Sequence, residues 1–260
     1  MIRSALVVID PQNDFCDRKG SLYVDGAEED IGRLSRHIKE NAADIGGIFV
    51  SLDSHDRVAI FHPAFWSGPD GSPAPFTPIS PADFKSGKWK AASPANEPFA
   101  ERTFSVIEAR GAGVLMVWPE HCVVSTWGHQ IAEPLRDALQ EWSATTGLAA
   151  RYVFKGENPY TDQFSVFEGV DDSYPETSFN ENFFARLLEF EQVTFAGEAL
   201  SHCVQESILS YVRKLDKTKG SPKQSVRLLV DCTSPVAGFD GSASCRLLHD
   251  AGVKLFSTNE

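Results

Sequence analysis

Short apolar runs recur along the chain and predict the strands of a buried sheet. They are hydrophobic throughout rather than alternating, which is typical of parallel strands that are covered on both faces. The runs occupy residues 5–9, 48–52, 152–154, 193–196, 226–230 and 253–256.

Segments between these runs carry the pattern of amphipathic helices. In three of them apolar residues recur at helical spacing, so each predicts a helix with one buried face. The three stripes are Ile31, Leu34 and Ile38 in segment 28–42, then Ile131, Leu135, Leu139 and Trp142, and finally Val204, Ile208, Val212 and Leu215. The alternation of strand and helix predicts a doubly wound α/β fold.

Residues 63–113 interrupt this alternation. They contain eight of the fifteen prolines of the chain, so they do not form a regular strand–helix unit. We expect a single domain over residues 1–260, with this segment as a long proline-rich insertion. A loop of this length is usually a lid, a binding loop or an oligomer contact. The pattern does not distinguish among these three roles, so a homo-oligomer is possible. The run "KTKGSPK" at 217–223 predicts a solvated loop.

Composition and charge narrow the classes of partner. The formal net charge is −12, which repels phosphate backbones, so no nucleic-acid partner is expected. No apolar run is long enough to cross a bilayer, so no membrane partner is expected either. The apolar run at the N-terminus is too short for a signal peptide and leads directly into Asp10 and Pro11. The five cysteines are an odd number and widely scattered, which favours a cytoplasmic location over a disulfide framework.

Reactive side chains follow four of the predicted strands. Asp10, Asp53 and Lys155 each end one apolar run, and Cys203 lies a few residues past another, where a helix begins. Ligands of open α/β sheets bind outside the carboxyl ends of the strands. We therefore expect these four side chains to converge in one crevice.

Three of these residues suit nucleophilic catalysis. The start of a helix favours the thiolate of Cys203, and a nearby Lys155 would stabilise it further. Asp10 could carry protons as a general acid and base. Taken singly, the three could equally be a buried small residue, a surface charge and a helix cap, but their shared position at strand ends favours the catalytic interpretation.

A second group has the composition of a metal site. Asp53 and His55 form a D-x-H pair, and His121 lies in "VWPEHCVVSTWG". Two imidazoles and one carboxylate suit zinc, with iron or manganese as alternatives. The pair alone is a weak signal, because a single histidine is more often a hydrogen-bonded bystander.

Five motifs, in order, resemble the isochorismatase-like cysteine hydrolase superfamily, and within it the metal-binding nicotinamidases and pyrazinamidases. They are "LVVIDPQNDFC", "LDSH", "VWPEHCVVSTWG", "VFKGENPYTDQFSVF" and "FAGEALSHCVQES". The resemblance implies a three-layer fold with a six-stranded, mostly parallel sheet. It also implies hydrolysis of a small amide, with nicotinamide converted to nicotinate and ammonia through a thioester.

The resemblance also assigns roles to individual residues. It implies a catalytic triad of Asp10, Lys155 and Cys203, and a divalent metal, zinc first, on Asp53, His55 and His121, with His62 as a further candidate ligand. It implies an oxyanion hole from the backbone N–H groups of Ala199 and Cys203, a non-proline cis peptide before Ala199, and stacking of the substrate ring between Phe15 and Trp118.

Departures from this pattern keep other functions open. The insertion is larger than in compact nicotinamidases, and Glu198 and His202 are additional polar residues beside the nucleophile. The alternatives are a metal-free amide or ureide hydrolase of the same superfamily, a metal- or ligand-binding protein without catalysis, and a vinyl-ether hydrolase of siderophore pathways. The last needs no cysteine, so Cys203 disfavours it. A phosphate-binding Rossmann enzyme is excluded because no G-x-G-x-x-G follows the first strand.

Overall fold

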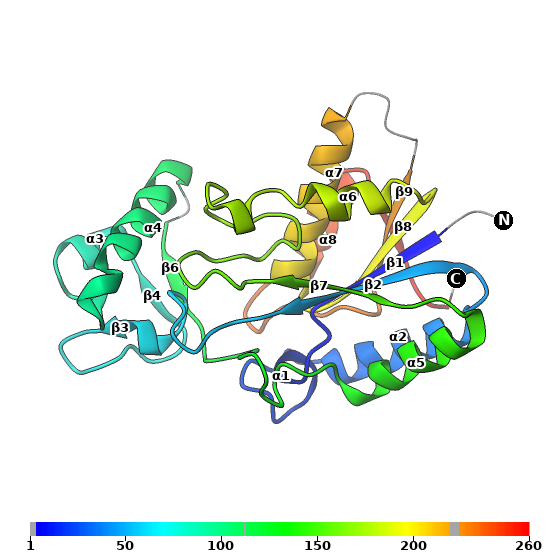
Figure 1. Ribbon diagram of the computed structural model, residues 1–260, viewed down its shortest axis with the longest axis horizontal. Helices are drawn as coiled ribbons and strands as arrows, with labels where there is room; N and C mark the ends of the chain where they lie inside the picture. Colours follow the sequence, from blue (N-terminus) through cyan, green and yellow to red (C-terminus); the bar gives the residue numbers. More distant parts are fainter. Residues whose placement is uncertain (1–3, 112, 219–223, 260) are drawn as a thin grey trace.

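The centre of the molecule is a six-stranded sheet with the order β10-β9-β8-β1-β2-β7 (Figure 1). The computed structural model describes residues 4–111, 113–218 and 224–259. The strands are β1 (Ser4–Ile9), β2 (Ile45–Asp53), β7 (Arg151–Lys155), β8 (Gln192–Gly197), β9 (Ser225–Leu229) and β10 (Lys254–Phe256). All six predicted strands are confirmed. The sheet was expected to be mostly parallel, and every pairing in it is parallel.

Helices cover both faces of this sheet, which gives three layers. Helices α2 (Ala27–Glu40) and α5 (Glu133–Thr146) lie on one face, and α6 (Glu181–Leu187), α7 (Gln205–Lys217) and α8 (Gly241–Asp250) lie on the other (Figure 1). Successive residues of β1 show why its run is apolar throughout. Leu6 and Val8 pack in the core under α2 and α5, whereas Val7 and Ile9 pack in the core under α7 and α8.

The three predicted helices are confirmed, with small changes at their ends. Ile131 precedes α5 and pairs with Gln12 in an isolated bridge. The helix after β8 opens with a π-helical turn, η4 (Leu200–Val204), before α7 begins. The other short helices are α1 (Asn13–Cys16) and the 3₁₀ turns η1 (Pro63–Phe65), η2 (Pro94–Asn96) and η3 (Pro175–Thr177).

The proline-rich insertion is ordered and lies beyond one end of the sheet (Figure 1). Its elements are β3 (Trp66–Ser67), β4 (Thr77–Ile79), α3 (Pro81–Lys85), β5 (Lys90–Ala91) and α4 (Glu97–Arg110), and β4 pairs antiparallel with β6 (Leu115–Val117), which follows it. Trp66 is fully buried, and the rings of Phe84 and Phe104 stack 4.7 Å apart. The insertion therefore adds its apolar side chains to the core under α2 and α5, without forming a strand–helix unit. Residues 219–223 of the expected solvated loop lie outside the described residues.

The topology fixes where a ligand can bind. The chain builds β1, β2 and β7 towards one edge and then β8, β9 and β10 towards the other, so the strand order reverses between β1 and β8. In doubly wound sheets the binding crevice opens at this reversal, outside the carboxyl ends of the strands. Asp10 directly follows β1, and Cys203 follows β8. Within the described residues, no helix is both long enough and apolar enough to cross a bilayer.

Close approach of β8 to β1 leads to a stability prediction. Gly197 has φ of +104°, and a Cβ there would lie 2.1 Å from the carbonyl oxygen of Ile9. We expect Gly197→Ala to lower the free energy of unfolding by at least ~2 kcal/mol, measured by urea denaturation. Gly32→Ala is the matched control, because Gly32 lies within α2 with no atom within 4 Å of the added methyl group. Stability there should rise by ~0.5–1 kcal/mol, and equal effects at the two sites would contradict this account.

Candidate active site and metal cluster

Lys155 is the centre of the polar cluster at the end of the sheet. Its Nζ lies 2.9 Å from Oδ2 of Asp10, 2.8 Å from Oδ1 of Asp53 and 3.5 Å from Sγ of Cys203. All four side chains are buried. A carboxylate oxygen of Asp10 and one of Asp53 lie within 4.8 Å of each other and of Sγ of Cys203. The predicted convergence of four strand-end residues is thus observed.

Burial acts against the negative charge that was expected on the Cys203 sulfur. It raises the pKa of the Cys203 thiol well above its ordinary value, and the nearby Lys155 only partly opposes this. Burial also raises the pKa of Asp10, again against the effect of Lys155. Desolvation thus opposes the predicted thiolate, which Lys155 and the helix start favour, and the thiolate stays a prediction. The Cys203 thiol lies beside a buried carboxyl group that can exchange its proton.

Asp10 is held in place by Ser51, which the sequence analysis missed. The Ser51 hydroxyl donates to Oδ1 of Asp10 at 2.6 Å and accepts from the backbone N–H of Asp10 at 3.0 Å. Asp10 has φ of +43°, a strained conformation for a residue with a side chain. A serine inside the apolar run of β2 was the signal for this contact.

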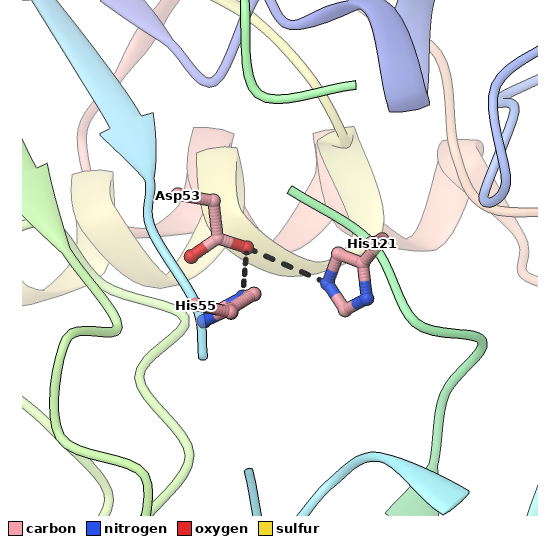
Figure 2. Close-up of side chains that lie close together, drawn as sticks. All are labelled: Asp53, His55 and His121. Carbon is pink, nitrogen blue, oxygen red and sulfur yellow. Dashed lines mark ion pairs between the residues drawn. The ribbon is translucent and has the colours of Figure 1, made fainter. Parts of the chain in front are cut away.

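Asp53, His55 and His121 form a compact cluster with open ligand atoms (Figure 2). Oδ2 of Asp53 lies 2.8 Å from Nε2 of His55 and 3.6 Å from Nε2 of His121. The Nδ1 atoms face backbone carbonyls, at 3.0 Å from Gly156 for His55 and 2.8 Å from Pro119 for His121. Backbone bonds of this kind fix the orientation of metal-binding histidines. The donor set fits a divalent metal such as zinc.

His62 lies beside this cluster rather than within it. Its Nε2 is 3.3 Å from Nδ1 of His121, on the side of that ring away from Asp53, and its Nδ1 faces the carbonyl of Asp56 at 3.2 Å. Burial and the two neighbouring histidines lower its pKa to about 3, so the imidazole is neutral. Its role as a ligand stays a prediction.

Gly156 packs against the metal cluster at a position where no larger residue fits. It has φ of +75°, and a Cβ would lie 2.4 Å from Cε1 of His55 and 2.8 Å from Oδ1 of Asp53. In the sequence, the only indication of this role is that Gly156 directly follows Lys155, the last residue of β7. Its absent side chain allows His55 and Asp53 to approach each other.

A pocket opens beside the nucleophile and the cluster. Its lining combines apolar and aromatic side chains with several polar groups, which is typical of small-molecule sites. It is lined by Phe15, Leu22, Asp53, His55, Phe61, Trp118, His121, Asp162, Gln163, Phe164, Ala199, His202, Cys203 and Val236. Both predicted stacking residues, Phe15 and Trp118, are therefore in its wall.

The segment between β8 and Cys203 completes the pocket floor. The peptide bond between Glu198 and Ala199 is cis, as the resemblance implies. The Ala199 N–H donates to no acceptor in the described part of the chain. Ala199 and Cys203 both line the pocket, and the oxyanion hole from their backbone N–H groups stays a prediction.

Two polar pocket residues were missed by the sequence analysis. Asp162 has its pKa raised to about 7 by burial and by the charge of Asp53. Gln163 accepts a bond from Lys155 Nζ at its backbone carbonyl and one from the Gly156 N–H at its side chain. Both lie in the "YTDQF" part of a quoted motif, which forms an irregular loop after β7 and offered no periodic signal.

Comparison with known proteins agrees with this geometry. No family model matches the chain. The nicotinamidase of Saccharomyces cerevisiae is 27% identical over 236 residues, which cover 89% of this chain and 88% of the yeast protein. The nicotinamidase/pyrazinamidase of Mycobacterium tuberculosis is 27% identical over 252 residues, 96% of this chain and 97% of that protein. The chain is a homologue of the nicotinamidases.

Solved nicotinamidase structures confirm the fold. The yeast nicotinamidase bound to the inhibitor nicotinaldehyde aligns with a TM-score of 0.68 at 20% identity, over 98% of this chain and 99% of that chain. The pyrazinamidase of Pyrococcus horikoshii in complex with zinc aligns with a TM-score of 0.59 at 18% identity, over 98% and 99% of the two chains. The chain therefore shares its fold with these structures over almost its whole length.

Proposed function

We propose that this protein is a metal-dependent cysteine amidohydrolase that converts nicotinamide to nicotinate and ammonia. One observation carries the proposal: Cys203 and the Asp53–His55–His121 cluster line a single pocket, and the Asp10–Lys155 ion pair lies directly behind Cys203. A nucleophile and a proton carrier serve acyl transfer, and two imidazoles with a carboxylate serve a metal. Homology to nicotinamidases selects nicotinamide among small amides.

Substrate binding uses the aromatic walls and the cluster. Phe15 and Trp118 would take the pyridine ring between them, because flat rings stack well against aromatic side chains. A divalent metal on the cluster, with His62 as a further ligand, would hold the pyridine nitrogen directly or through water. Zinc is the first candidate, supported by the zinc complex of the P. horikoshii pyrazinamidase, with iron and manganese as alternatives.

The chemical steps follow from the groups around Cys203. Asp10 takes the thiol proton as Sγ bonds to the carboxamide carbon, and the carbonyl oxygen becomes an oxyanion. N–H groups of Ala199 and Cys203 stabilise this oxygen, at ~3 kcal/mol per donor. Asp10 then gives the proton to the nitrogen, the C–N bond breaks and ammonia leaves a thioester on Cys203.

In the hydrolysis of the thioester, Asp10 again accepts a proton and then returns one, this time from water to the Cys203 sulfur. Asp10 takes a proton from water as its oxygen bonds to the acyl carbon, the C–S bond breaks, and the proton returns to sulfur. Lys155 stays charged throughout: burial favours the neutral amine, but Asp10 and Asp53 raise its pKa well above the ordinary value. Its charge compensates whichever partner is anionic.

A related amidase with a different substrate is the second candidate. Phe76, in the insertion, packs edge-on against Trp118 with ring centroids 6.0 Å apart, and its N–H donates to the carbonyl of Val117. The insertion thus supports the pocket wall from outside and can alter which ring fits. The non-catalytic alternative has less support, because the triad positions are filled and in contact.

The proposal also covers the domain organisation, the cellular location and the oligomeric state of the protein. We propose that residues 1–260 form one catalytic domain, with the insertion as the outer support of its pocket. All five cysteines are unpaired, which supports a cytoplasmic location. Self-association stays a prediction, and size-exclusion chromatography with light scattering tests it.

Ammonia release from a small panel of amides tests the function. We expect zinc-loaded protein to release ammonia from nicotinamide and pyrazinamide. Benzamide is the matched control, because it has the same ring size and carboxamide but no ring nitrogen, and it should react at least about tenfold more slowly. Ammonia from none of the three would refute the proposal, and equal rates for benzamide and nicotinamide would refute the role of the ring nitrogen.

A further inference from the structure

Glu198 is a buried acid at the edge of the proposed oxyanion hole. It directly precedes Ala199, is fully buried, and was singled out in the sequence as an unexplained polar residue. A buried carboxyl group is costly unless it makes hydrogen bonds or keeps its proton. The reaction steps above do not use it, so its position needs another explanation.

Ser234 connects Glu198 to the far side of Ala199. The Ser234 N–H donates to Oε2 of Glu198 at 3.1 Å, and the Ser234 carbonyl accepts from the Leu200 N–H at 2.9 Å. One residue thus bonds to both neighbours of Ala199. The two bonds fix the backbone on either side of the Ala199 N–H.

The connection continues into helix α2. The Ser234 hydroxyl donates to Oδ2 of Asp30 at 2.5 Å, and Oδ1 of Asp30 pairs with Nη2 of Arg33 at 2.5 Å. Arg33 in turn donates through Nε to the carbonyl of Asp231, at the start of the loop that carries Ser234. The segment before the nucleophile is therefore tied to a rigid helix by polar contacts.

We propose that Glu198 is a positioning residue that, through Ser234, aims the Ala199 N–H at the oxyanion of the reaction. The proposal rests on the function proposed above. A displacement of about 1 Å in a group that contacts the transition state can cost on the order of 100-fold in rate. The contact between Glu198 and Ser234 prevents such a displacement.

The charge of Glu198 is consistent with this role. Burial, and then the negative charge of Asp30, raise its pKa well above the ordinary value. The other ionisable groups near it are Arg33 and the buried thiols of Cys16 and Cys232, both with raised pKa values. Oε1 accepts from no donor in the described part of the chain, which leaves it free to carry the proton. A neutral acid adds no repulsion beside the oxyanion.

Two substitutions separate positioning from charge. Glu198→Ala removes the bond to Ser234, and we expect kcat for nicotinamide to fall about 10- to 100-fold with little change in KM or bound zinc. Glu198→Gln keeps a neutral acceptor of the same shape, so its kcat should stay within about threefold of wild type. Glu168→Ala is the control for general loss of contacts, because among the described residues the Glu168 side chain bonds only to Ser210 and Arg213 on α7. An unchanged kcat in Glu198→Ala, or equal losses in Ala and Gln variants, would overturn the proposal.

Nicotinaldehyde tests the oxyanion contact without turnover. Its carbonyl carbon can accept the Cys203 sulfur, with the thiol proton passing to the carbonyl oxygen, to give a thiohemiacetal whose oxygen occupies the oxyanion position. We expect nicotinaldehyde to bind at least about tenfold more weakly to Glu198→Ala than to wild type and Glu198→Gln, with nicotinate binding unchanged. If wild type fails to hydrolyse nicotinamide, the proposed function fails, and this comparison still decides the role of Glu198. Equal aldehyde affinity in all three proteins would contradict it.

Stability against pH provides a second readout if Glu198→Ala does not fold. The unfolded state loses the Glu198 proton above its ordinary pKa near 4.5, whereas the folded state keeps it. The folded state then binds more protons, so wild-type stability falls as pH rises through this range. Glu198→Gln lacks the titration, so its stability should rise relative to wild type as the pH increases above about 4.5, and parallel curves would contradict a neutral Glu198.

Discussion

Replacing Cys203 by alanine is expected to reduce kcat for nicotinamide by about 10⁵-fold or more. The thiol supplies the bond that makes the thioester, and no other thiol and no hydroxyl side chain is among the described residues that line the pocket. Loss of a covalent nucleophile usually removes most of the rate enhancement. The measurement is ammonia release by zinc-loaded protein over a long incubation.

The controls for this variant separate chemistry from folding. Sγ of Cys203 contacts Lys155 at 3.5 Å, but Lys155 keeps its ion pairs with Asp10 and Asp53. We therefore expect Cys203→Ala to retain its zinc, its nicotinate affinity and its thermal unfolding temperature within a few degrees. Cys203→Ser should be nearly as inactive, because a hydroxyl is far less acidic than a thiol. Ammonia release above a hundredth of the wild-type rate from Cys203→Ala would refute the thioester route.

Removal of the metal is expected to lower kcat/KM for nicotinamide by about 100- to 1,000-fold. In the proposed site a bound metal would hold the pyridine nitrogen and so place the carboxamide over Cys203, a contribution of orientation rather than of a hydroxide nucleophile. Chelation followed by dialysis should abolish most of the activity, and added zinc should restore it. Metal content by elemental analysis accompanies each assay.

Histidine variants show whether the metal acts at this cluster. His121→Ala should lose metal and activity together, because its Nε2 faces Asp53 from the ring side opposite its backbone contact. His249→Ala is the matched control, since the exposed His249 side chain pairs, within the described part of the chain, only with its neighbour Asp250. Full activity in chelated protein free of metal, or full zinc content in His121→Ala, would contradict the assignment. Loss of activity in both histidine variants would indicate unfolding instead.

The sequence predicted the framework better than the fine structure of the site. Apolar runs identified all six sheet strands, because burial on both faces leaves a plain hydrophobic signal such as that of β1. Their ends identified Asp10, Asp53 and Lys155, since parallel strands share one carboxyl edge. The prediction that these three side chains converge with Cys203 then followed from the topology of the sheet alone.

Contacts between distant segments were not predictable in the same way. Ser51 reaches Asp10 only because β2 pairs with β1, and Gly156 is required only because His55 folds against it. The effect of burial on the pKa of Cys203 was not predictable, because helix position is local but desolvation depends on the whole packed pocket. Asp162 was missed for a related reason, as its loop has no periodicity.

The central claim is that Cys203 carries the acyl group of the substrate. Acid quenching during turnover of nicotinamide by zinc-loaded protein, followed by peptide mass spectrometry, tests it most directly. The account predicts a nicotinoyl group on the peptide that contains Cys203, present in wild type and absent in Cys203→Ala. Continued ammonia release with that peptide unmodified at every quench time, or acylation of another residue, would contradict it.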